Sequence, residues 1–124
     1  MRSIFLTVFA AVLCAGCSTQ QIYDGPRLPR DQVARISGDM RFTAGVPVSV
    51  LLRQVDGRTL GASASSVEVM PGSRRLLVDC VVHESRSTSR HTLDVDVVAG
   101  QRYRLVAETG TGLRQCTSVR LEQQ

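Results

Sequence analysis

Apolar and polar residues alternate along most of the chain beyond residue 32. A period of two residues is typical of a β-strand that packs one face on a core. The pattern predicts about seven short strands, at residues 33–36, 46–52, 67–69, 76–82, 93–97, 103–107 and 117–121. No stretch has the 3.6-residue period of an amphipathic helix, and the connections are too short for parallel crossovers. We therefore expect an all-β fold, a small antiparallel β-sandwich.

Turn-forming residues separate these strands. Asp56-Gly57 ends the second strand as a turn, and Ala99-Gly100 leads into the sixth. Pro71-Gly72 predicts a type II turn, in which the glycine has a positive φ. Pro47 cannot donate a ladder hydrogen bond, so we expect its end of the strand to lie at a sheet edge.

The first seventeen residues have the organisation of an export signal. Arg2 precedes an apolar run at residues 4–13, which has the length of a secretory core and half that of a membrane-spanning helix. The small pair Ala15-Gly16 then precedes Cys17. This stretch resembles the lipobox of bacterial lipoproteins, although Cys14 stands where leucine is usual. The resemblance implies removal of residues 1–16 and acylation of the Cys17 thiol.

Three alternatives remain for this segment. Acylation of Cys14 would place Val12 and Leu13 against the cut, which fits a small-residue cleavage site poorly. The others are a plain signal peptide and an uncut membrane anchor. Under the leading interpretation, acyl chains such as palmitate hold Cys17 in the membrane lipid, and two or more chains make a durable anchor. Ser18 follows the cysteine, which by the same resemblance favours the outer membrane, facing the periplasm.

The remaining chain divides into two parts. Residues 17–31 carry Pro26 and Pro29 and predict a lipidated cysteine with a flexible tether, whereas residues 32–124 form the sandwich domain. The net charge is +4, and the basic residues are scattered, with no run longer than Arg74-Arg75. Because a nucleic-acid binder needs a clustered basic surface, nucleic acid is not an expected partner.

Cys80 and Cys116 are left as a pair if Cys17 carries lipid. In an oxidising compartment they predict a disulfide that closes a loop of about 37 residues. The alternation places Cys80 on the core face but Cys116 on the outer face, in phase with Ser118. A β-bulge near Gln115 would bring the two thiols together, and without one they would lie apart.

No candidate metal site or catalytic residue emerges, and no cofactor is expected. His83, Glu84 and His91 flank a predicted hairpin. If Leu76 and Leu93 share the core face, however, His83 faces outward and His91 inward, so the histidines do not converge. Asp94 and Asp96 share one strand face, which predicts a solvated surface. The sequence contains neither a glycine-flanked serine elbow nor an H-E-x-x-H motif.

Three short motifs resemble known envelope proteins. Val55-Asp56-Gly57, followed by Val67-Glu68-Val69 and then Pro71-Gly72-Ser73-Arg74, resembles the repeat of PEGA-type domains, which are small extracytoplasmic β-sandwiches. Ala99-Gly100-x-x-Tyr103-x-Leu105 and Tyr23-x-Gly25-Pro26-x-x-Pro29 resemble segments of small proteobacterial lipoproteins that have no assigned activity.

These resemblances imply a non-catalytic structural or protein-binding role in the cell envelope. The alternative is a module that binds peptidoglycan or another anionic glycan, motivated by the mild positive charge. An enzyme would require a pocket with converging polar groups.

Overall fold

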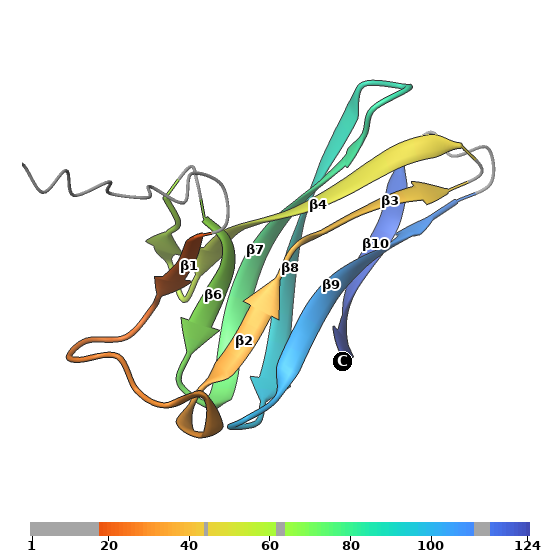
Figure 1. Cartoon of the computed structure of the whole chain (residues 1–124). Coiled ribbons are helices and arrows are strands. Elements are labelled where there is room, and N and C mark those ends of the chain that lie inside the picture. Colours follow the sequence, from red (N-terminus) through yellow and green to blue (C-terminus); the bar gives the residue numbers. More distant parts are fainter. Residues whose placement is uncertain (1–17, 44, 62–63, 111–114) are drawn as a thin grey trace, which may run out of the picture.

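The computed structural model describes residues 18–43, 45–61, 64–110 and 115–124. Within these residues the chain forms ten β-strands and one 3₁₀ turn, arranged as two facing sheets (Figure 1). The predicted all-β sandwich is therefore confirmed. The elements are β1 (Ser18–Gln21), η1 (Arg30–Gln32), β2 (Ala34–Ser37), β3 (Asp39–Thr43), β4 (Val46–Val55), β5 (Arg58–Thr59), β6 (Ala64–Val69), β7 (Gly72–Val82), β8 (Ser87–Val97), β9 (Arg102–Thr109) and β10 (Cys116–Gln123).

The strand order, which the sequence left open, differs between the two sheets. Sheet A has the order β1-β6-β2-β9-β10, and sheet B has the order β3-β4-β7-β8 with β5 paired to β4. All pairs in sheet B are antiparallel. In sheet A, β1 pairs parallel with β6, and β2 pairs parallel with β9. The sandwich is thus mostly antiparallel, with two parallel contacts between strands distant in sequence.

The core lies between the sheets and is built from the alternating apolar positions. In β7, Leu76, Val78, Cys80 and Val82 are all fully buried. They meet Ile36, Val67 and Leu105 of sheet A in one hydrophobic cluster. Each such buried aliphatic side chain contributes about 1.5–3 kcal/mol. The alternating pattern therefore identified the side chains that hold the two sheets together.

The β7–β8 hairpin has the predicted parity but is longer than expected. Leu76 lies opposite Leu93, and Cys80 lies opposite Ser89, so both apolar sets share the inner face. Pairing continues to Val82 and Ser87, which confines the turn to residues 83–86. Arg86 has a φ of 54° in that turn.

The segment after Cys17 is folded onto the domain. Ser18–Gln21 forms β1, and the Ile22 side chain joins the hydrophobic core. The Ile22 amide also donates to the Glu68 carbonyl at 2.9 Å. The predicted flexible tether at residues 17–31 is therefore wrong for residues 18–22 and for η1. Pro26 and Pro29 restrict their own neighbourhood, but they do not prevent an upstream polar strand from pairing with the free edge of β6.

Pro47 also departs from expectation. It lies inside sheet B, opposite Phe42 of β3, rather than on an edge strand. Its carbonyl accepts from the His83 amide at 3.1 Å, at the point where β7 ends. The His83 carbonyl accepts instead from the Arg86 amide within the hairpin turn. Since no carbonyl there needs a donor from residue 47, proline is tolerated.

Two predicted turns have the expected backbone geometry. Asp56 and Gly57 both have positive φ, at 49° and 80°, as a two-residue hairpin turn between β4 and β5 requires. Gly72 has a φ of 117° where the chain passes from sheet A to sheet B. The positive φ predicted for Gly72 is confirmed.

Candidate functional site

Cys80 and Cys116 form a disulfide in the structure, with their Cα atoms 6.3 Å apart. Cys80 belongs to sheet B and Cys116 to sheet A, so the bond joins the two layers. A register shift between Cys116 and Ser118 lets both Cys116 and Val119 face the core. The bulge that the alternation required is therefore present, centred on Thr117 rather than near Gln115.

Cys17 and Cys14 lie outside the described residues. The structure begins at Ser18, the first residue of β1. Acylation therefore stays a prediction from sequence. Among the described residues no helix is long and apolar enough to cross a bilayer.

The two histidines have separate partners, so the prediction that they do not converge is confirmed. His83 Nε2 lies 2.8 Å from the Ser49 hydroxyl, and His91 Nε2 lies 2.9 Å from the Ser89 hydroxyl. His91 sits on the half-buried inner face opposite Val78, whereas His83 is exposed beside the hairpin turn. Over the described ranges, no three His, Cys, Asp or Glu side chains gather as a metal site would require.

Asp94 and Asp96 lie on the exposed outer face of β8, as the alternation predicted. Asp94 Oδ1 accepts from Arg75 Nε at 2.9 Å, and this hydrogen bond is the main reason why the pKa of Asp94 is lowered. Asp96 accepts from the Ser73 hydroxyl at 2.6 Å. Each carboxylate is thus held by a partner on β7, which fits a surface role better than paired acid–base chemistry.

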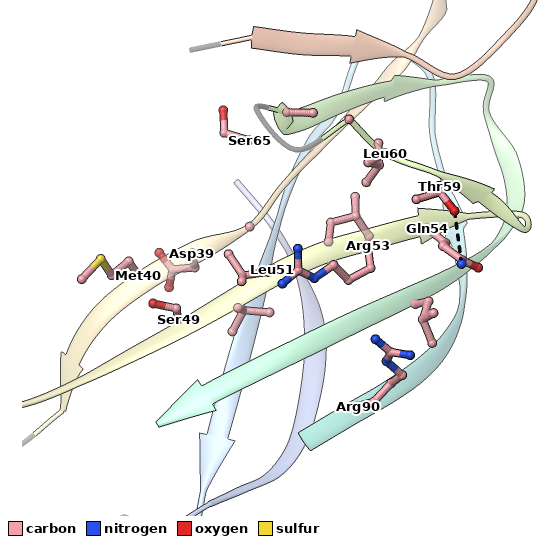
Figure 2. Close-up of a pocket in the computed structure, with 16 residues that line it drawn as sticks. Asp39, Met40, Ser49, Leu51, Arg53, Gln54, Thr59, Leu60, Ser65 and Arg90 are labelled. Carbon is pink, nitrogen blue, oxygen red and sulfur yellow. Dashed lines mark hydrogen bonds between the residues drawn. The ribbon is translucent and has the colours of Figure 1, made fainter. Parts of the chain in front are cut away.

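A groove of ≈ 720 Å³ lies on the outer face of sheet B (Figure 2). Strand β4 supplies its floor, and β3, β5 and the segment leading into β6 supply its walls. Its lining comprises Gly38, Asp39, Met40, Ser49, Val50, Leu51, Leu52, Arg53, Gln54, Thr59, Leu60, Gly61, Ala64, Ser65, Leu77 and Arg90. The described lining thus combines apolar side chains with hydroxyls, two guanidiniums and the Asp39 carboxylate, a mixture typical of binding pockets.

Two arginines of the groove converge on one carboxylate. Arg53 Nε lies 3.0 Å from Asp79 Oδ2, and Arg90 Nε lies 2.9 Å from Asp79 Oδ1. The Asp79 side chain is only 9% exposed, whereas Arg53 and Arg90 are 50% and 63% exposed. The hydrogen bond from Arg90, assisted by Arg53, outweighs the burial and lowers the pKa of Asp79.

A β-bulge aims Arg53 at this carboxylate. In the β4–β7 ladder Leu52 pairs with Val78 and Gln54 pairs with Leu77, so Arg53 is the extra residue. Bulges commonly redirect a side chain in this way. Sequence reasoning missed the cluster because its members come from three strands and match no local motif. The one available signal was Asp79 itself, the single polar residue within residues 76–82.

Replacing Asp79 by Asn is expected to lower the free energy of unfolding at pH 7 by about 1–2 kcal/mol, because two charge-assisted hydrogen bonds are weakened. Folding lowers the pKa of Asp79 below its ordinary value of 3.8. The Asp79 carboxylate therefore stabilises the folded state fully above that pH, and the stabilisation is lost as the pH falls through the pKa of the folded state. Urea unfolding should therefore show that the difference in free energy of unfolding between the wild type and Asp79→Asn becomes smaller as the pH is lowered from 5 to 2. A gap independent of pH would contradict the ionic role.

Apolar side chains lie exposed beside the same groove. Met40 of β3 is 61% exposed, and Leu51 of β4 is also exposed. Met40 pairs with Ser49 in the ladder, which places it on the outer face of sheet B. Phe42, two residues further along β3, is exposed as well. Contiguous exposed apolar side chains commonly mark a contact surface.

Sheet A carries a cationic cluster near the start of β2, whereas the groove lies beyond the end of that strand. Arg35 and Arg102 lie side by side in the parallel β2–β9 ladder. With Arg30 and Glu68 they line one small pocket, and the Glu68 carboxylate pairs instead with Arg27, whose Nε lies 3.4 Å away. Over the described residues, no ion pair joins Arg35 or Arg102 to a carboxylate.

Comparison with known proteins gave no match. No protein-family model matches the sequence, and neither a curated protein nor a solved structure matches the chain. The resemblance of short segments to PEGA-type domains and proteobacterial lipoproteins therefore stays a prediction.

Proposed function

We propose that this chain is a bacterial lipoprotein, acylated on Cys17 and anchored in the outer membrane with its sandwich facing the periplasm. Its role there is non-catalytic, either structural or protein-binding. The observation that carries the proposal is the N-terminal sequence, in which an apolar run of secretory length leads to Ala15-Gly16-Cys17. Two further features support it: the disulfide and the character of the groove.

The Cys80–Cys116 disulfide supports an exported location, because such bonds persist in oxidising compartments and are rare in the cytosol. The groove supports a binding role. It combines exposed apolar side chains, including Met40 and Leu51, with two guanidiniums. Exposed apolar side chains rimmed by polar groups are typical of a surface that contacts a protein or a membrane.

The proposal is tested by following the protein between membrane and soluble fractions. Cys17→Ser is expected to lose membrane retention completely, because no thiol remains to carry the acyl chains. Cys14→Ser is the matched control and should fractionate like the wild type. Mass spectrometry of the N-terminal peptide should show the acyl mass on Cys17 in both the wild type and Cys14→Ser. If Cys14→Ser instead releases the protein, the assignment of Cys17 is wrong.

The protein-binding role has its own measurement. Crosslinking in intact envelopes, followed by identification of captured proteins, should recover an envelope protein with the wild type. The capture should be lost with Cys17→Ser, which releases the protein from the membrane. If the wild type enriches no envelope protein over crosslinked envelopes that lack it, the protein-binding role is wrong.

The second candidate function is binding to peptidoglycan or another anionic glycan. The observation that favours it is the pair Arg35 and Arg102, adjacent in sheet A and without a carboxylate partner in the described structure. Arg35→Gln/Arg102→Gln should abolish co-sedimentation with purified sacculi at low salt. Arg58→Gln/Arg86→Gln, which removes the same two charges at exposed positions, is the charge-matched control. If the wild type itself does not sediment, this candidate is excluded.

A further inference from the structure

Strand β1 joins the proposed anchor directly to the wall of the groove. Ser18 pairs with Ala64, and Ala64 and Ser65 line the groove. Gln20 Oε1 also accepts from the amide of Gly61, another lining residue, at 2.8 Å. Cys17 is bonded to Ser18, and consecutive Cα atoms are about 3.8 Å apart. The residue proposed to carry the acyl chains therefore directly precedes a strand that pairs with the wall of the groove.

No residue lies between Cys17 and the first residue of β1. The Ile22 amide continues the pairing of β1 with β6, and the Thr19 and Ser66 hydroxyls lie 2.8 Å apart across that ladder. A domain on a flexible tether could turn any face to the membrane. With the anchor bonded to a paired strand, the surface near Ser18 is held at the bilayer.

The chemistry of the groove matches a lipid surface. Met40 and Leu51 present exposed apolar side chains on the outer face of sheet B. Arg53 and Arg90 share the single carboxylate of Asp79, while Asp39 of the lining is paired with Arg41. This leaves one positive charge in excess and several exposed N–H groups. Arginines near an anionic membrane surface are attracted to it, and guanidinium groups bind phosphate well. Figure 2 shows Arg53 and Arg90 among the residues that line the same pocket as Met40 and Leu51.

We infer that the groove face of sheet B is a membrane-contact surface, with Met40 and Leu51 in the bilayer interface and Arg53 and Arg90 at the lipid phosphates. The inference rests on the proposed acylation of Cys17 and adds the orientation of the domain. It commits to the bilayer as the occupant because the proposed anchor lies beside this groove. A protein partner in the groove is the competing outcome.

The sandwich offers a matched reference position at its other end. Val98 is 60% exposed, almost the same fraction as Met40. It lies before the turn in which the Gly100 amide donates to the Val33 carbonyl, at the start of β2. The groove lies at the opposite end of β2, where the Gly38 amide donates to the Ser65 carbonyl. Figure 1 shows the β8–β9 turn at the lower end of the molecule, away from the start of β1.

The chain contains no tryptophan, so a single introduced indole reports its own surroundings. The full-length acylated protein, purified as Met40→Trp and separately as Val98→Trp, is placed in phosphatidylcholine vesicles containing one-fifth phosphatidylglycerol, with or without bromine on the acyl chains. Bromine should reduce the fluorescence of Met40→Trp at least twofold and leave that of Val98→Trp unchanged. Leu51→Trp repeats the measurement at a second groove position, in case Met40→Trp does not fold.

The possible outcomes distinguish the inferred orientation from the proposed acylation of Cys17. If the purified protein carries no acyl mass and does not float with vesicles, both the acylation and the orientation are wrong. If it is acylated and floats, but bromine quenches the groove and reference positions equally, the orientation is wrong while the lipoprotein assignment stands. The orientation is also wrong if neither position is quenched, as expected when a partner protein is needed to cover the groove.

Discussion

Replacing Cys80 and Cys116 together by alanine is expected to lower the free energy of unfolding by about 3–4 kcal/mol. The bond joins residues separated by 36 positions, and the loop-entropy model gives roughly this value for a loop of that length. Both cysteines are buried, so the loss of sulfur packing adds to the effect. Because 1 kcal/mol shifts the Tm of a domain of about 100 residues by about 4–8 °C, a fall of about 12–30 °C should follow.

Thermal unfolding followed by circular dichroism measures this change. The comparison is best made with Cys17→Ser added to both proteins, so that acylation does not contribute. Wild-type cysteines with excess reductant should give the same Tm as the double alanine variant, apart from the small packing difference. If the reductant leaves the Tm of the oxidised protein unchanged, the disulfide does not contribute to stability as stated.

The alternation of β7 could be predicted because its two faces meet different surroundings. Leu76, Val78 and Cys80 face the other sheet, and a period of two residues follows directly from strand geometry. The same rule applied to Cys116 gave the wrong face unless a bulge intervened. A bulge inserts one residue into a ladder without a distinctive sequence, so its need could be inferred while its place at Thr117 could not.

Three short strands, β1, β3 and β5, escaped prediction for a related reason. The four residues of β1 are all polar, and the two apolar residues of β3, Met40 and Phe42, are exposed rather than part of the core. β5 is only two residues long. An edge strand gains backbone hydrogen bonds from one neighbour without contributing a full apolar face, so its sequence carries little of the signal. The expected tether was wrong because β1 belongs to this class.

The cluster of Arg53, Asp79 and Arg90 was beyond sequence reasoning because its geometry depends on two ladders at once. The β7–β8 register places Asp79 opposite Arg90. The interrupted β4–β7 register brings Arg53 to the same carboxylate. A one-residue slip in either ladder would send the side chain to the other face of the sheet. Such a site becomes visible only when strand order and register are known.

Gly38→Ala is expected to lower the free energy of unfolding by about 3 kcal/mol. Gly38 links β2 to β3, where the chain leaves sheet A and enters sheet B. A Cβ atom at this position would overlap the carbonyl oxygen of Val50 in β4. Because the obstacle is backbone rather than the end of a flexible side chain, the β3–β4 ladder must move to admit a methyl group.

Gly61→Ala is the matched control, since Gly61 also lines the groove but its added Cβ would meet only the Gln20 side-chain oxygen, at 3.5 Å. Its free energy of unfolding should stay within about 0.5 kcal/mol of the wild-type value, or rise slightly, because alanine restricts the unfolded chain. Chemical denaturation of the two variants gives the comparison. Equal stability of Gly38→Ala and Gly61→Ala would mean that the Val50 carbonyl moves aside at little cost, and the steric explanation for Gly38 would then be wrong.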